Sequence, residues 1–185
     1  MPQKNEIAVF GGGCFWCTEA IFKMLKGVVS VMPGYAGGPS TGVGNSVSYG
    51  QVSTGATGHA EAVRIEYDPT RISYETLLTV FFATHDPTSL NRQGADVGTQ
   101  YRSTVLYTTD TQKRAAERMI QELNASTEQG KPIVTEVKPF EHFYEGENYH
   151  RDYYANNKDQ SYCQIVINPK LEKVRKKFAD LIKTS

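Results

Sequence analysis

Three cysteines and one acidic residue are the groups in this sequence best able to do chemistry. Cys14 follows the glycines at 11–13 and begins a segment with helical spacing of apolar residues. At the start of a helix the unpaired backbone N–H groups and the positive end of the dipole favour a negative charge, so we predict a lowered pKa for the Cys14 thiol. Because the thiolate is the nucleophilic form of cysteine, the sequence predicts a reactive sulfur at residue 14.

Cys17 lies one helical turn after Cys14 and completes a C-x-x-C pair. That spacing is used by dithiol redox sites and by zinc ligands. A zinc site needs two further ligands at matching spacing, and the chain offers only Cys163 and four scattered histidines, His59, His85, His142 and His150. The pair therefore favours redox chemistry without a metal, and a zinc-stabilised interaction module stays as an alternative.

Glu61 is the candidate proton donor. In the alternating segment 59–67 it shares a face with Val63 and Ile65. A carboxyl turned toward a core loses hydration, so its pKa rises and it can remain protonated as a general acid; the alternative is a strand-end carboxylate that reaches water. Tyr101, which we expect to open the next strand, could present its phenol to the same cleft or serve only a structural hydrogen bond.

The elements expected around these groups alternate between strands and helices. We predict strands over residues 6–10, 28–35, 59–67, 101–108 and 133–138, helices over 14–26, 73–84 and 110–127 and one opened by Pro169, loops over 36–50 and 86–100, and an extended segment over 162–167. Short helices that cross between strands favour an α/β (α+β) two-layer sandwich of the split βαβ, ferredoxin-like kind, followed by a long irregular C-terminal segment. Residues 1–185 are expected to form a single domain.

Composition narrows the possible partners. Twenty basic residues balance twenty acidic ones, so we expect no nucleic-acid partner and no attraction to anionic membranes, and the basic run 170–177 is typical of an amphipathic surface helix. No apolar run is long enough for a membrane helix and the first residues lack a signal peptide, so we expect a cytoplasmic enzyme and not a membrane protein. We expect the enzyme to be a monomer. Three cysteines, an odd number, argue against a structural disulfide framework.

Several separated motifs together resemble one known family. They are Gly13-Cys14-Phe15-Trp16, Gly58-His59-Ala60-Glu61, the segment 34–38, the segment 85–88, the segment 96–103, and Tyr149-His150 with Tyr153. In this order, over about residues 7–163, they resemble the peptide methionine sulfoxide reductases of the A type.

The resemblance implies reduction of the S epimer of methionine sulfoxide, free or in oxidised proteins, on a two-layer α/β fold. It implies that Cys14 is the nucleophile and Glu61 the acid, with Tyr49 and Tyr101 as hydrogen-bond donors to the sulfoxide oxygen. Around them, three sets of residues are implied to shape the site: Phe15 and Trp16 as walls of an apolar pocket for the substrate methyl, Asp96 as a residue that orders the site, and His150 and Tyr153 at its rim.

The implied reaction leaves a sulfenic acid on Cys14, which a second thiol condenses into a disulfide and thioredoxin then reduces. No metal or organic cofactor is expected. Cys163 stands where family members often carry this resolving thiol, and we favour it, but it precedes an apolar run and a helix instead of a glycine-rich tail. Cys17, where many members have glycine, is the alternative.

Two rival activities remain open at this point. A dithiol-disulfide oxidoreductase would use Cys14 and Cys17 on protein disulfides. A cysteine hydrolase would pair Cys14 with a histidine base, although none of the four histidines has a predicted place beside it.

Overall fold

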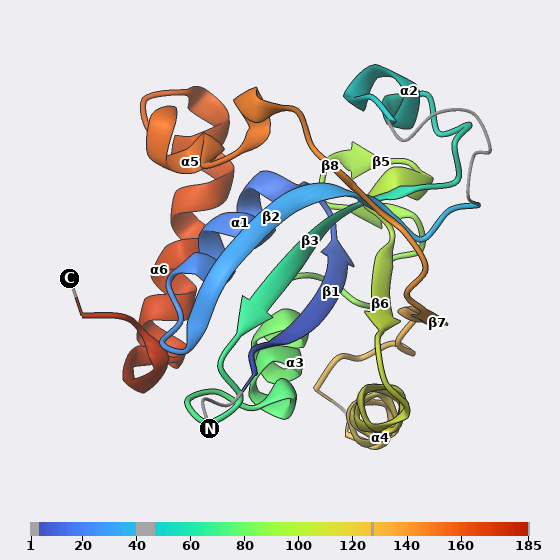
Figure 1. The fold of residues 1–185 in the computed structure, drawn as a ribbon, viewed down its shortest axis with the longest axis vertical. Helices are drawn as coiled ribbons and strands as arrows, with labels where there is room; N and C mark the ends of the chain where they lie inside the picture. The colour runs from blue at the N-terminus through green and yellow to red at the C-terminus, as the bar shows by residue number, and fades with distance from the viewer. Residues whose placement is uncertain (1–3, 40–46, 127, 185) are drawn as a thin grey trace.

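A curved six-stranded sheet is the centre of the molecule (Figure 1). The computed structural model describes residues 4–39, 47–126 and 128–184. The strands, in the order in which they lie side by side, are β7 (Glu136–Pro139), β6 (Ser103–Tyr107), β1 (Glu6–Gly12), β3 (Ala60–Tyr67), β2 (Val28–Ala36) and β8 (Phe143–Glu145). All neighbouring pairs are antiparallel except β6 and β7, which are parallel. A separate two-stranded ribbon joins β4 (Arg92–Gln93) to β5 (Asp96–Val97).

Helices α1 and α3 lie against the sheet, and the remaining helices lie around them. They are α1 (Phe15–Lys23), α2 (Tyr49–Ser53), α3 (Tyr74–Ala83), α4 (Asp110–Ala125), α5 (Tyr153–Asn156) and α6 (Asn168–Lys177). Ser73 caps α3 by accepting a hydrogen bond from the backbone N–H of Thr76 at 3.1 Å. The observed class is therefore a mixed α/β fold.

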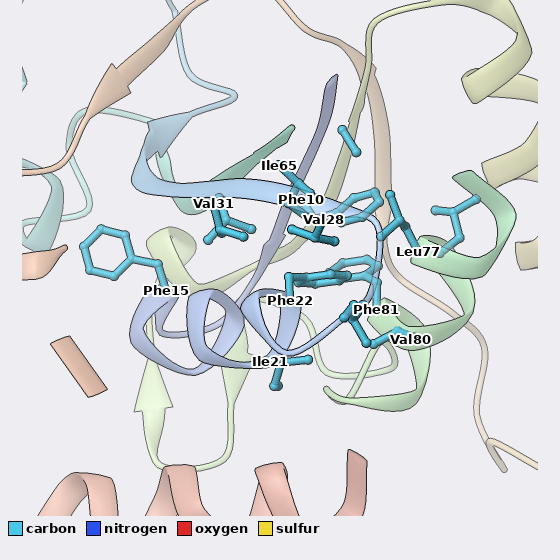
Figure 2. Packing of buried hydrophobic residues seen from close by; sticks show 14 of the residues in the cluster. Phe10, Phe15, Ile21, Phe22, Val28, Val31, Ile65, Leu77, Val80 and Phe81 are labelled. Carbon is cyan, nitrogen blue, oxygen red and sulfur yellow. The ribbon is translucent and has the colours of Figure 1, made fainter. Parts of the chain in front are cut away.

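The main core lies between the sheet and helices α1 and α3 (Figure 2). Phe10 of β1 stacks on Phe81 of α3 with ring centroids 4.8 Å apart, and Phe22 of α1 lies 5.7 Å away. Val63 and Ile65 of β3 join the same cluster and are fully buried. The period-two pattern of the strand thus places these residues, and Glu61 with them, toward the helices.

The opposite face of the sheet carries a smaller core. Val9, Ala62 and Leu106 are buried there and pack against Phe140 and Phe143, from the segment that crosses this face between β7 and β8 (Figure 1). Because both faces are covered, β1 and β3 are buried along most of their length.

Helix α6 adds a layer beyond α1. Leu171 and Val174 are buried, and α6 packs on α1 on the side away from the sheet. The expected two-layer sandwich is therefore extended on this side by a C-terminal helix. None of the helices in residues 4–39, 47–126 and 128–184 is both long and apolar enough to span a bilayer.

Four expected elements differ from the structure or lie partly outside its described residues. Residues Cys163–Ile167 form a π-helical turn that runs into α6, not an extended segment. Because Cys163 and Ile167 are buried while Ile165 is exposed, the spacing of this face is helical, and packing overrides the β propensity of the run.

Tyr101 ends a 3₁₀ turn, Thr99–Tyr101, and the strand begins only at Ser103. The strand expected from residue 133 begins at Glu136. Of the expected loop 36–50, residues 40–46 lie outside the described residues, and its last two residues begin α2.

Candidate active site

Cys14 stands at the turn between β1 and α1. Gly13 has a φ of +95°, a left-handed conformation that favours glycine, and this turn brings Cys14 to the N-cap position of α1 with φ −58° and ψ 124°. Cys14 is partly exposed and lines a cavity of about 800 Å³. The predicted place of Cys14, at a helix start and open to a cavity, is therefore what the structure shows.

The prediction of a lowered pKa for Cys14 is wrong for the substrate-free protein. Burial raises the pKa of the Cys14 thiol, and its interaction with Cys17 raises it further. The first N–H of α1, that of Phe15, donates its hydrogen bond to Oε1 of Glu61 at 3.2 Å and not to the Cys14 sulfur. The positive end of the helix is thus engaged by the carboxyl group.

Cys17 has the lower pKa of the two neighbouring thiols. Its interaction with Cys14 lowers the pKa of Cys17 to about 7, against the effect of burial, and the charge of Lys170 lowers it as well. The two sulfurs therefore share one proton near neutral pH and titrate as a pair. A single negative charge is available at this pair for nucleophilic attack.

Glu61 has the properties of a general acid. Its side chain is only 2 % exposed, and burial raises the pKa of the carboxyl to about 8, although the hydrogen bond from the Phe15 N–H opposes this. The carboxyl is therefore mostly protonated at neutral pH and lies at the same helix start as Cys14. The alternative of a water-exposed carboxylate does not hold.

Two phenols share the electrostatic environment of Glu61. Tyr49 is the first residue of α2 and Tyr101 ends the 3₁₀ turn before β6, and both are partly exposed. Burial raises the pKa of each phenol, and the Glu61 carboxyl is the next cause for both. Each phenol therefore stays protonated and can donate a hydrogen bond close to Glu61.

Aromatic rings surround Cys14 on the α1 side. Trp16 stacks on Tyr153 with ring centroids 3.7 Å apart, and its indole Nε1 donates to Nδ1 of His150 at 3.0 Å. Phe15 is fully buried and lies 5.0 Å from the His150 ring, between centroids. His150, expected at the rim, is instead 1 % exposed and holds Trp16 from within the fold. Burial lowers the pKa of His150, so the ring is neutral.

Asp96 reaches the thiols through a tyrosine. The hydroxyl of Tyr162 donates to Oδ2 of Asp96 at 3.2 Å and lies 4.0 Å from Sγ of Cys17. Asp96 is thus placed to fix Tyr162 above the cysteine pair. Sequence reasoning missed Tyr162, whose only signal was its place next to Cys163.

Glu147 is a second residue that the sequence did not single out. Its carboxylate accepts hydrogen bonds from the Tyr35 hydroxyl at 3.0 Å, from the backbone N–H of Tyr49 at 3.2 Å and from the Tyr149 hydroxyl at 2.9 Å. Burial would raise the pKa of Glu147, but these donors lower it below its ordinary value. The carboxylate therefore fixes the start of α2, where Tyr49 lies. Its position three residues before His150 was the available signal.

Cys163 is fully buried in the π-helical turn. Burial raises the pKa of the Cys163 thiol, and the charge of Cys17 raises it further. The turn that holds Cys163 packs against α1, the helix of Cys17. All three cysteines are free. Over the described ranges, no group of three or more His, Cys, Asp or Glu side chains is arranged to hold a metal ion.

Comparison with known families decides the assignment. The chain matches the family described as peptide methionine sulfoxide reductase over residues 6–182. It belongs to the peptide methionine sulfoxide reductase family. The resemblance seen in the sequence is therefore confirmed, and the chain reduces methionine sulfoxide.

Relatives within the peptide methionine sulfoxide reductases cover nearly the whole chain. The protein MsrA of Saccharolobus solfataricus is 54 % identical over 178 residues, which are 96 % of this chain and 97 % of that protein. MsrA of Thermus thermophilus is 51 % identical over 183 residues, 99 % of both chains.

Solved structures of this family share the fold. Reduced Mxr1 from Saccharomyces cerevisiae superposes with a TM-score of 0.82 at 35 % identity, covering 88 % of this chain and 91 % of that one. Methionine sulfoxide reductase A of Corynebacterium diphtheriae gives a TM-score of 0.77 at 31 % identity, covering 83 % and 76 %.

Proposed function

We propose that the chain reduces the S epimer of methionine sulfoxide, free or within oxidised proteins, by attack of the Cys14 sulfur with Glu61 as the acid. The observation that carries this proposal is the hydrogen bond between Glu61 and the Phe15 N–H, which holds a buried, protonated carboxyl at the helix start occupied by Cys14. A nucleophile and a proton donor at one backbone turn are what sulfoxide reduction requires.

In the first step the Cys14 thiolate attacks the sulfoxide and the oxygen passes to the cysteine. The S–O bond to methionine breaks, an S–O bond to Cys14 forms, and the proton of Glu61 ends on that oxygen. Methionine sulfur is reduced by two electrons, and Cys14 is oxidised by two to a sulfenic acid. Tyr49 and Tyr101 donate hydrogen bonds to the oxygen as negative charge develops on it. Phe15 and Trp16 line the side on which the substrate methyl lies, next to Tyr153 and His150.

For the second step we propose Cys17 as the first resolving thiol. Cys17 interacts directly with Cys14 and has a pKa of about 7, so its thiolate is available. Condensation of the Cys14 sulfenic acid with the Cys17 thiol gives a disulfide and releases water. Cys14 is the non-helical N-cap residue, which leaves its side chain free to turn toward Cys17.

Cys163 enters the scheme after Cys17. It is buried in the π-helical turn that packs against α1, the helix of Cys17. Exchange of its thiolate with the Cys14–Cys17 disulfide would release Cys14 and leave a Cys17–Cys163 disulfide. The sequence analysis favours Cys163 as the direct partner of Cys14, and this stays a prediction. A direct Cys14–Cys163 disulfide would require the turn at 163–167 to unwind.

Thioredoxin is our candidate reductant for the final disulfide. A dithiol protein reduces such a bond by exchange, takes up the two electrons as its own disulfide, and leaves the enzyme thiols free. Yeast Mxr1 has been solved in complex with Trx2, at 24 % identity to this chain.

A stereospecific single-turnover assay tests the proposal. Without reductant, wild type should release two methionines per enzyme from racemic methionine sulfoxide, because exchange with Cys163 frees Cys14 for a second attack, and Cys163→Ser should release one. With excess dithiothreitol, only the R epimer should remain after many turnovers of wild type. Cys14→Ser should release none. Appreciable methionine release by Cys14→Ser would defeat the assignment of the nucleophile.

Thiol variants separate the two resolving cysteines. Under our proposal, Cys17→Ser traps a sulfenic acid that dimedone labels after one turnover, whereas Cys163→Ser forms the Cys14–Cys17 disulfide. Labelling of the Cys163→Ser variant and not of the Cys17→Ser variant would return the first resolving role to Cys163.

A dithiol-disulfide oxidoreductase is the second candidate, favoured by the pKa of about 7 at Cys17. Reduction of insulin disulfides, measured beside sulfoxide reduction, distinguishes the two activities. The buried acid Glu61 has no role in disulfide exchange, so Glu61→Gln should leave insulin reduction unchanged while sulfoxide reduction falls.

We also propose the finer architecture and setting. The order β6-β1-β3-β2, with α1 linking β1 to β2 and α3 linking β3 to β6, supports the ferredoxin-like split βαβ arrangement for the inner strands. One continuous main core supports a single domain over residues 1–185. Three free thiols suit a reducing, cytoplasmic location, which fractionation would test.

A further inference from the structure

Cys14 lines a cavity that the other proposed reacting groups, Glu61, Tyr49 and Tyr101, do not line. It measures about 800 Å³, begins at Cys14 and Tyr162, and runs along the C-terminal helix to Phe178. One wall is apolar, with Val166, Pro169 and Val174. A free methionine sulfoxide held by Glu61, Tyr49 and Tyr101 would leave this cavity empty, so the cavity is available to the rest of a larger substrate.

Three lysines follow the same wall of this cavity. Lys170, Lys173 and Lys177 line it and stand at i, i+3 and i+7 of α6 and its end, which is one face of a helix. The span from the first to the last is about 10 Å along the helix axis, the length of about three residues of an extended peptide. The lysines therefore form a row parallel to the groove.

These lysines have no acidic partner in the described part of the chain, where none of the ion pairs involves them. Arg175, on another face of α6, pairs instead with Glu172 at 3.8 Å. Lys170 lies near enough to the thiols that its charge lowers the pKa of Cys17. The row thus begins at the reacting sulfurs and leads away from them.

The acidic residues of the groove do not neutralise its far end. Asp86 accepts hydrogen bonds from Thr88 and Ser89, and Asp96 accepts one from Tyr162 beside the cysteines. Both carboxylates line the groove, but in the described residues neither forms an ion pair with a lysine of α6. Around Lys173 and Lys177 the groove carries positive charge over an apolar floor.

We propose that this groove binds the polypeptide that flanks an oxidised methionine, and that it selects acidic flanking segments through Lys173 and Lys177. The inference rests on the proposed function, since it requires the methionine sulfoxide to sit at Cys14. Charge complementarity indicates the ligand: an extended acidic segment of three or four residues matches the length of the lysine row and is opposite to it in charge.

The test compares peptides that contain a single central methionine sulfoxide. The second to fourth residues from it, on its N-terminal or its C-terminal side, are glutamate, glutamine or lysine. Dithiothreitol replaces thioredoxin, so that only substrate binding is measured. The variant is Lys173→Glu. Its matched control is Lys176→Glu, which makes the same charge change at an exposed position of α6 that does not line the groove.

At 50 mM salt, wild type should show a kcat/KM about three- to tenfold higher for the glutamate peptide than for the lysine peptide on one side, falling at 300 mM salt. Lys173→Glu should abolish or invert this preference, and Lys176→Glu should keep it. Free methionine sulfoxide should be reduced equally by all three proteins.

Equal kcat/KM for glutamate and lysine peptides on both sides, or an equal effect of the two variants, would overturn the groove assignment. A parallel assay with thioredoxin as the reductant covers the other possible occupant: if Lys173→Glu changes only the KM for thioredoxin there, the row binds the reductant and the groove assignment is overturned. Failure of wild type to reduce free methionine sulfoxide would instead overturn the proposed function itself.

Discussion

The pH dependence of the first turnover should be set by Glu61. Its pKa of about 8, against an ordinary value of 4.5, leaves about 90 % of the carboxyl protonated at pH 7, whereas an ordinary carboxyl would be about 0.3 % protonated. Burial thus supplies roughly 300-fold more of the acid form at neutral pH.

The sign follows from the proton that must be present. As pH rises through about 8, Glu61 loses its proton and methionine release should fall about tenfold per pH unit. On the acid side, release should fall as the thiol pair takes up its second proton, with Cys17 titrating near 7. The expected profile is a bell with its maximum between about 7 and 8.

The assay is rapid-quench methionine release from free methionine (S)-sulfoxide without reductant, from pH 5.5 to 10. Glu61→Gln keeps the shape and a hydrogen-bonding group but cannot supply the proton, so its rate should fall by about 10²- to 10⁴-fold and lose the alkaline limb. Tyr67→Phe serves as a control, because it also removes a buried polar group from β3, but one that donates to Glu6 at the other end of the strand. A wild-type rate that keeps rising to pH 10, or a Glu61→Gln variant at the wild-type rate, would refute the reasoning.

Three further perturbations test the structure. Glu147→Gln removes the carboxylate that fixes the start of α2, and kcat/KM for free methionine sulfoxide should fall about tenfold with unchanged circular dichroism. Tyr162→Phe removes a hydrogen bond that lowers the pKa of Cys17, so the pH profile of thiol alkylation should shift upward, and an unchanged profile would contradict the contact. Phe81→Ala leaves a cavity beside Phe10 and should lower the free energy of unfolding by about 3–5 kcal/mol in urea titrations.

Sequence reasoning was most successful where local periodicity and burial agree. The alternating segment that contains Glu61 predicted a buried carboxyl, and both its burial and its raised pKa are found. The helix start at Cys14, after the glycines at 11–13, also lies where the residue types indicated. These features depend on neighbours within one turn or one strand, which the sequence displays directly.

The features that sequence reasoning missed depend on contacts between distant segments. The 163–167 turn has strand-forming residues, but its packing beside α1 and its continuity with α6 make it helical. Glu147 acts on Tyr49 across 98 positions, and Tyr162 meets Asp96 across 66. No local pattern encodes such pairs, so the roles of these residues became visible only in the fold.

The same kind of contact explains why the predicted pKa of Cys14 was wrong while the predicted chemistry fits the site. The start of α1 was expected to stabilise the Cys14 thiolate, but its first N–H bonds to Glu61 instead. When Glu61 gives its proton to the sulfoxide oxygen, the carboxylate that remains already has that N–H as a donor and the positive end of the helix beside it. The helix therefore stabilises the conjugate base of the acid at the moment it forms, while the thiol pair supplies the negative charge for attack by sharing one proton. In Glu61→Asp the side chain is one methylene shorter, so the carboxyl lies farther from this N–H. Methionine release should therefore fall although a proton donor is retained.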